Sequence, residues 1–206
     1  MLPSQLSKRL LDDTKLADVD IVAGDKVFRA HRQILAGASS VLYTMLTSEM
    51  EEAKTGRIEI KAEAETVDLF KKYIYTQDVS IFMKASEFQL AELYHLSKFF
   101  EVEGLSQACS KMMTDNLELS NLLQSITVAG RFEDENLMKA CLKLIEHKSK
   151  DLMCNEDWIW FISQNLWVCK ALKHQLALSK QNASSEGSAS WNYPVSGVFK
   201  VRPTRD

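Results

Sequence analysis

Residues 18–52, DVDIVAGDKVFRAHRQILAGASSVLYTMLTSEMEE, decide the fold of this chain. Two short apolar runs, 19–23 and 26–28, flank Gly24-Asp25, and a glycine in a two-residue turn predicts a β-hairpin. Two short helices are predicted next, over 34–37 and 39–46, with Ser39 placed to cap the second. The polar stretch 49–54 is expected to be a loop, and 57–60 alternates polar and apolar residues as a strand does.

The remaining chain is mostly helical in pattern. Residues 4–12 predict an amphipathic helix with one apolar stripe, formed by Leu6, Leu10 and Leu11. A helix this short is not stable alone, so its stripe must be covered. From residue 65 onward apolar residues recur at helical spacing, as in Phe88, Leu93, Leu96, Phe99 and Phe100, up to a last predicted helix over 166–178. The exception is 79–82, for which a short strand is expected, and these patterns together predict an α+β fold with an all-α extension.

Composition excludes several classes of function. The 206 residues carry a net charge of −3, which gives no electrostatic argument for a nucleic-acid or membrane partner. No apolar run approaches the ~20 residues that a bilayer requires, and the N-terminal residues lack the apolar core of a signal peptide. The four cysteines, Cys109, Cys141, Cys154 and Cys169, form no C-x-x-C pair, so buried reduced thiols are expected rather than a metal site or disulfides.

Two segments carry a resemblance to a known family. Residues 28–42, FRAHRQILAGASSVL, and Tyr73-Ile74-Tyr75-Thr76 resemble the signature segments of the BTB (POZ) domain, in order and spacing, over about residues 14–115. The resemblance implies the BTB/POZ fold, a small β-sheet flanked by helices. Residues 45–54 and the helical segment 117–178 are most similar to the speckle-type POZ (MATH–BTB) branch with its short BACK (3-box) region, without the MATH domain. We therefore expect a dimerisation helix (1–13), a BTB domain (14–116), a BACK/3-box helical domain (117–179) and a linker with a peptide-like tail (180–206).

The resemblance also implies partners. BTB domains of this branch are homodimeric adaptors that bind the N-terminal domain of cullin-3, the scaffold of a ubiquitin ligase, and present a substrate protein or peptide. The family's cullin-binding motif, apolar-x-Glu, matches Met50-Glu51-Glu52, although a motif of three residues has little specificity by itself. A solvated acidic loop is the alternative interpretation. The residues expected to contact the cullin are Tyr43, Leu46, Met50, Glu52, Leu119, Leu122 and Leu123, with core packing as the alternative for the leucines.

Self-association follows from the same resemblance. Because the family packs its first helix across a two-fold axis, Leu6, Leu10 and Leu11 are expected at the dimer interface. Asp18 and Arg32 are expected to pair near the dimer centre, or else to be unrelated surface charges. A second contact, between BACK regions, is expected at Leu172, where the family has an aromatic residue, and this departure leaves higher-order assembly open.

No constellation indicates catalysis. His31 lies beside Arg32, but the resemblance implies that it holds the corner between strand and helix. No nucleophile with a base, no glycine-rich phosphate loop and no metal-ligand spacing is present, so no enzyme activity and no cofactor are expected. An adaptor of this kind acts inside the cell, in the nucleus or the cytoplasm. The competing hypothesis is a BTB oligomerisation module that binds co-regulator peptides in transcription and no cullin.

The composition changes after Lys180. Residues 181–190, QNASSEGSAS, are small and polar, as in a linker. The stretch 191–206, WNYPVSGVFKVRPTRD, has aromatic and β-branched residues with two prolines and three basic residues. It is either a tail without a fixed structure, an extension foreign to the domain, or an extended peptide ligand tethered by the linker.

Overall fold

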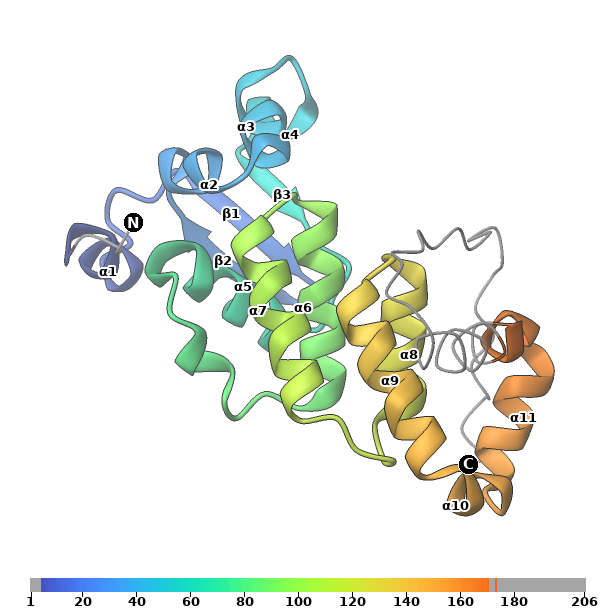
Figure 1. Cartoon of the computed structure of the whole chain (residues 1–206). Coiled ribbons are helices and arrows are strands. Elements are labelled where there is room, and N and C mark those ends of the chain that lie inside the picture. Colours follow the sequence, from blue (N-terminus) through green and yellow to red (C-terminus); the bar gives the residue numbers. More distant parts are fainter. Residues whose placement is uncertain (1–4, 171–172, 174–206) are drawn as a thin grey trace, which may run out of the picture. The chain divides into compact units, whose positions relative to one another are not determined.

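A computed structural model describes residues 5–170 and 173 of the chain, with the side chains of 5 and 6 left out (Figure 1). The chain divides into two compact units, Met1–Met113 and Thr114–Asp206, which we call the N-terminal unit and the C-terminal unit. The α+β fold class predicted from the sequence is confirmed, since a small three-stranded sheet is combined with many helices.

The N-terminal unit holds the sheet and the helices around it. Its elements are α1 (Gln5–Asp12), β1 (Val19–Ala23), β2 (Lys26–Ala30), α2 (Arg32–Ala38), α3 (Ser40–Thr47), α4 (Glu51–Thr55), β3 (Arg57–Glu59), α5 (Ala64–Thr76), the 3-10 helix η1 (Val79–Phe82), α6 (Glu87–Phe99) and α7 (Glu103–Asp115). In Figure 1, α3 and α4 stand at one end of this unit, and α6 and α7 lie side by side in front of the sheet.

The sheet has the strand order β2-β1-β3. Strands β1 and β2 are antiparallel and meet at the pair Ala23 and Lys26, which confirms the predicted hairpin. Gly24 turns with φ +57°, a conformation that glycine adopts without steric cost. Strand β3 runs parallel to β1 on its other side. Because β2 and β3 are the two edge strands, residues 31–56 must carry the chain across the sheet, and they form α2, α3 and α4.

Two local predictions were wrong. Residues 51–55 of the expected polar loop form the one-and-a-half-turn helix α4, which has two glutamates in its first turn and ends at Gly56 in the left-handed conformation. Residues 79–82 form a 3-10 helix rather than a strand, because the carboxylate of Asp78 caps it by accepting the backbone N–H of Ser80 (2.9 Å). The predicted N-cap is confirmed: the Ser39 hydroxyl accepts the N–H of Leu42 (3.0 Å) at the start of α3.

The core of the N-terminal unit lies between the sheet and α5, α6 and α7. Aromatic rings fill it: Phe70 packs on Phe100 with centroids 5.3 Å apart, and Tyr73 stacks on Phe82 at 5.6 Å. Each of these rings is buried, as are Ile21 of β1, Ile58 of β3 and Leu35 of α2. Phe88, expected on the apolar face of α6, is instead half exposed in the first turn of that helix.

The C-terminal unit is all helical in its described part. It contains α8 (Leu122–Arg131), α9 (Glu135–His147), α10 (Ser149–Met153) and α11 (Glu156–Gln164), and residues 166–170 are helical as well. Leu122, Ile126, Leu137 and Cys141 are buried between α8 and α9. A Cβ on Gly130 would lie 2.6 Å from the ring of Trp167, so the absence of a side chain at 130 allows this tryptophan to pack.

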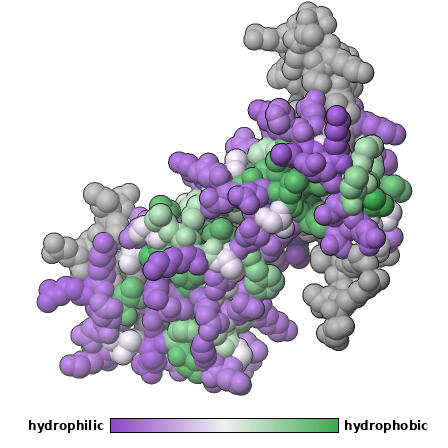
Figure 2. All heavy atoms as spheres, turned by 90° about the horizontal axis from the view of Figure 1, so that it is seen from below, coloured by the Kyte–Doolittle hydropathy of each residue, from purple (hydrophilic) through white to green (hydrophobic). Residues whose placement is uncertain are grey.

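The surface is mixed in character. Figure 2 shows small hydrophobic areas among hydrophilic side chains on the face seen from below. None of the helices in the described part of the chain is both long and apolar enough to cross a membrane.

Candidate protein-contact surface

A buried hydrogen-bonded pair fixes the start of α2. The hydroxyl oxygen of Tyr75, on α5, lies 2.8 Å from both the backbone nitrogen and Nδ1 of His31. The backbone N–H of His31 donates to this oxygen, and the two rings meet edge to face. Burial raises the pKa of the Tyr75 phenol, opposed by the hydrogen bond from the His31 backbone, so the hydroxyl stays neutral. His31 thus ties the turn between β2 and α2 to the core.

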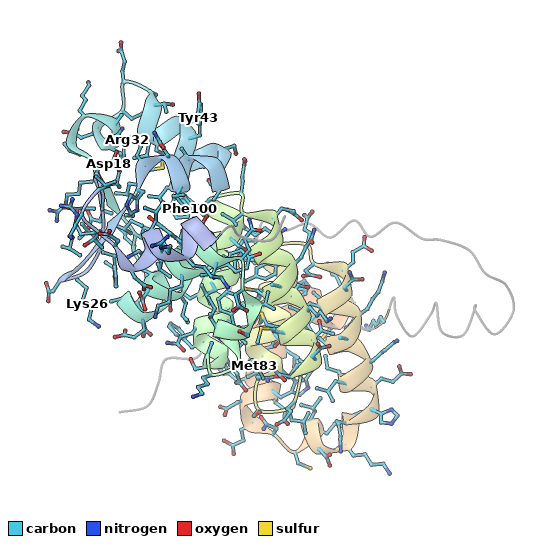
Figure 3. All side chains as sticks on the ribbon, turned by 90° about the vertical axis from the view of Figure 1, so that its left-hand side faces the viewer. Asp18, Lys26, Arg32, Tyr43, Met83 and Phe100 are labelled. Atoms are coloured by element: carbon cyan, nitrogen blue, oxygen red, sulfur yellow. The ribbon has the colours of Figure 1, made fainter. Side chains whose placement is uncertain are left out.

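Arg32 joins α2 to Asp18 and to the two helices that follow it, α3 and α4. Its backbone N–H donates to Oδ1 of Asp18 (2.8 Å), and its Nε lies 3.8 Å from Oδ2 of the same carboxylate. Its guanidinium donates to the carbonyl oxygen of Leu46, at the end of α3, and to that of Ala53 in α4 (3.3 Å from Nη2). Asp18 and Arg32 therefore pair within one chain (Figure 3), and the Arg32 guanidinium also links α3 to α4; the predicted position of the pair near a dimer centre stays a prediction.

Three of the predicted cullin-contact residues lie on α3 and at the start of α4. Tyr43 on α3 is 58% exposed and Met50 is 44% exposed, while Glu52 in the first turn of α4 is half-buried. We call Tyr43, Met50 and Glu52 the α3–α4 surface. Figure 3 shows Tyr43 pointing away from Arg32, toward solvent.

Leu46 does not belong to this surface. It is 1% exposed and packs in the core, because the face of α3 that carries Leu42 and Leu46 turns inward. The prediction of Leu46 as a contact residue is therefore corrected in favour of its alternative, core packing.

The structure adds Phe99, which the sequence pattern used only to indicate a helix. Phe99 is 59% exposed at the end of α6 and packs edge to face on the buried ring of Phe100 (centroids 4.9 Å apart). The turn after α6 adjoins α3, since the Ser39 hydroxyl donates to the Phe100 carbonyl oxygen and the Ser40 hydroxyl donates to the Glu101 carboxylate. Ser40 and Tyr43 are one helical turn apart, so the turn after α6 contacts the helix that also carries Tyr43.

A signal for Phe99 was present in the sequence. Adjacent residues on a helix point about 100° apart, so Phe99 and Phe100 cannot both face the centre of one core. The structure shows that the turn after Phe100 is unusual: Glu101 has a φ of +52°, which is uncommon for a residue other than glycine.

In the C-terminal unit the three leucines predicted to contact the cullin differ in their exposure to solvent. Leu122 is fully buried between α8 and α9, which again corrects a predicted contact to core packing. Leu119, in the turn before α8, is 37% exposed, and Leu123 is half-buried. Only these two present side-chain surface to a partner.

The predicted dimer helix is present as α1. Leu10 and Leu11 are half-buried, and α1 packs along α5. The side chain of Leu6 lies outside the described residues, and so do Leu172 and the whole segment 180–206.

The cysteines and acidic residues form no evident reactive centre in the described part. Cys109 and Cys141 are buried, and burial raises the pKa of each thiol to about 12, which keeps them protonated and unreactive. Cys154 is exposed, contrary to the expectation of four buried thiols, because it lies at the end of the short helix α10. Within residues 5–170, no group of three or more His, Cys, Asp or Glu side chains is arranged to hold a metal ion.

Comparison with known proteins identifies the family. A family model for the BTB/POZ domain matches residues 7–117, more than half of the chain. The chain belongs to the BTB/POZ domain family.

Its relatives carry different partner domains. BTB and MATH domain-containing protein 40 of Caenorhabditis elegans is 29% identical over 178 residues, covering 81% of this chain and 43% of the relative. Kelch repeat and BTB domain-containing protein 4 of Mus musculus is 28% identical over 75% of this chain and 28% of the relative. Kelch-like protein 24 of Homo sapiens is 24% identical over 92% of this chain and 31% of the relative. The chain thus spans less than half the length of these relatives, and their similar identities assign it to no particular branch.

Proposed function

We propose that this chain is the homodimeric core of a non-catalytic substrate adaptor that recruits a cullin-3 ubiquitin ligase. The observation that carries the proposal is the exposure of Met50, two residues before the half-buried Glu52, at the junction of α3 and α4, where the resemblance to the BTB family expects an apolar-x-Glu motif. A buried Met50 would have argued against it.

The chemistry of the α3–α4 surface suits a helical protein partner. Met50 is a flexible apolar side chain that adapts to a pocket, and the Glu52 carboxylate can accept charge-assisted hydrogen bonds. Tyr43 adds exposed aromatic area, and aromatic residues are enriched at the centres of protein interfaces. Arg32 holds α3 and α4 in place before binding, which lowers the entropic cost of association.

We further propose the finer assignment to the speckle-type POZ branch. In this proposal residues 117–179 are a BACK/3-box region, Leu119 and Leu123 take part in its cullin contact, and α1 packs across a two-fold axis. A dimer would present two cullin sites and two substrate arms, and so gain avidity. The protein would act in the nucleus or the cytoplasm.

Binding to the purified N-terminal domain of cullin-3, measured by calorimetry, tests the main proposal. Met50→Asp buries a charge in the interface and should weaken binding at least tenfold, and Glu52→Ala should weaken it several-fold. Met83→Asp is the matched control, since Met83 is 80% exposed and lies at the far end of the N-terminal unit from Tyr43 (Figure 3). Absence of binding by the unsubstituted chain would reject the adaptor function and favour the oligomerisation module.

The dimer is tested separately by light scattering at micromolar concentration. The chain should have twice its monomer mass, and Leu10→Asp should halve it by placing a charge in the apolar stripe of α1. A monomeric mass for the unsubstituted chain would rule out the interface at α1.

A further inference from the structure

Ser48 lies in the short segment that joins α3 to α4, two residues before Met50 of the α3–α4 surface. The backbone of Ser48 (φ −82°, ψ −174°) and that of Met50 (φ −65°, ψ 161°) are both extended. Helix α4, which follows, has five residues and none of them is fully buried, so its first turn can unwind at low cost. Residues 48–52 can therefore enter the groove of a modifying enzyme as an extended peptide.

The Ser48 hydroxyl differs from the other hydroxyls of residues 39–55. It accepts the backbone N–H of Met50 (3.3 Å) at an exposed position and, in the part of the chain that the structure describes, donates to no group. The other five hydroxyls donate to carbonyl or carboxylate oxygens, and they belong to Ser39, Ser40, Thr44, Thr47 and Thr55. Replacing the hydroxyl proton of Ser48 therefore breaks no donated hydrogen bond, whereas the same change at the other five positions would break one.

Acidic residues follow Ser48 at the positions that an acid-directed protein kinase recognises. Glu49, Glu51 and Glu52 stand one, three and four residues after it, and the first two are exposed. Ser48 is the only serine or threonine among the 206 residues with an acidic residue at the third following position. A kinase with a basic substrate groove would select this segment, because complementary potentials steer a charged segment to its binding site.

We propose that Ser48 is a phosphorylation site for an acid-directed serine/threonine kinase. ATP is the phosphoryl donor in this step. The bond between the γ-phosphorus and the oxygen that bridges it to the β-phosphorus breaks, and a bond between Ser48 Oγ and the γ-phosphorus forms. The hydroxyl proton passes to a carboxylate base of the kinase, and ADP leaves. The phosphorylated side chain carries a charge of about −1.5 to −2 at pH 7.

The effect on binding rests on the proposed adaptor function of the α3–α4 surface. Ser48 Oγ lies 3.3 Å from the backbone nitrogen of Met50, so the phosphate stands beside a residue that the partner is proposed to enclose. The neighbouring side chains of Glu49 and Glu51 add charge of the same sign. A partner that encloses Met50 must then remove water from an anion without a paired cation, which is costly. Phosphorylation of Ser48 therefore lowers the affinity for cullin-3.

Treatment of the full chain with ATP and purified casein kinase 2, an acid-directed kinase, tests the site without reference to cullin-3. Mass spectrometry should map the phosphate to Ser48, and Ser48→Ala should abolish this modification. Glu51→Gln should lower the initial rate about fivefold, whereas Glu59→Gln, which removes an exposed carboxylate from β3, should leave it nearly unchanged. No phosphate at Ser48 would overturn the inference, and equal rates for the two glutamine variants would refute the role of the acidic residues.

Calorimetry with the N-terminal domain of cullin-3 measures the effect on binding separately. The phosphorylated chain should bind about tenfold more weakly than the untreated chain, and kinase-treated Ser48→Ala should bind as the untreated chain does. Equal affinities of the phosphorylated and untreated chains would refute the regulatory role of Ser48. Absence of binding by the untreated chain would instead reject the adaptor function, and phosphate mapped to Ser48 would still establish the site.

Discussion

Residues 31–56 contain two regions with different roles. At the start, around His31 and Arg32, polar groups point inward and are hydrogen bonded to Tyr75, Asp18 and the carbonyls of Leu46 and Ala53. At the junction of α3 and α4, Tyr43 and Met50 point outward. Substitutions in the region of His31 and Arg32 should change the free energy of unfolding. Those in the region of Tyr43 and Met50 should change only the affinity for cullin-3.

Arg32→Met should have the largest effect and should lower both stability and the affinity for cullin-3. It removes charged hydrogen bonds to two carbonyls and should cost about 3 kcal/mol of stability. Because the α3–α4 surface loses its support, cullin-3 binding should weaken too. Urea unfolding measures the first effect, with the exposed Arg57→Met as a control expected to change stability by less than about 0.5 kcal/mol. If a destabilised Arg32→Met variant bound cullin-3 with unchanged affinity, Arg32 would not be needed to hold the α3–α4 surface for binding.

Tyr75→Phe should cost about 2 kcal/mol, since it leaves the buried N–H of His31 without an acceptor. Tyr43→Phe removes the same hydroxyl from an exposed ring and should be nearly neutral. Thermal unfolding of both variants measures the two losses of stability. Equal losses would contradict the division between the region of His31 and Arg32 and the region of Tyr43 and Met50.

The interior should also control stability at alkaline pH. Burial raises the pKa of Cys109 from 9.0 to about 12, so the unfolded chain releases this proton first. The contribution of this thiol to stability should therefore be constant below pH 9 and fall above it, by up to about 1.4 kcal/mol per pH unit. Urea unfolding between pH 8 and 10.5 should show a shallower decline for Cys109→Ala. The exposed Cys154→Ala should retain the decline of the unsubstituted chain.

Ser39→Ala should cost about 1 kcal/mol, because its hydroxyl caps α3 and donates to the Phe100 carbonyl oxygen. Ser40→Ala, one residue on, removes an exposed hydrogen bond to Glu101 and should cost less than about 0.5 kcal/mol. Chemical denaturation resolves the two, and a larger loss for Ser40→Ala would show that the turn at Glu101 matters more than the cap.

Sequence reasoning succeeded where one local rule acts alone. The Gly24 turn and the Ser39 cap follow from backbone conformation and capping chemistry, so both were predicted. Helix α4 was missed because it has five residues, too few to show an apolar period. The run at 79–82 is apolar and short, a length at which helix and strand patterns coincide.

The candidate site was harder to predict because exposure is a tertiary property. Leu46 and Met50 are both apolar and four residues apart, yet one is buried and the other is not. The chain ends α3 at Thr47 and begins α4 at Glu51, and this break changes the direction of every later side chain. Leu122 was misplaced, and the exposure of Phe99 was not predicted, for the same reason: spacing identifies a helix, but only packing decides which side faces inward.

The crossing of the chain from β2 to β3 has a consequence for protein engineering. Residues 31 and 57 mark the two places where this segment joins the sheet, and the sheet register depends on β1 and its neighbours. The outer positions of α3 and α4 take no part in that register. The residues at 43, 50 and 52 can thus be exchanged for those of another BTB protein to give this scaffold a new binding specificity, while the buried Leu46 is kept.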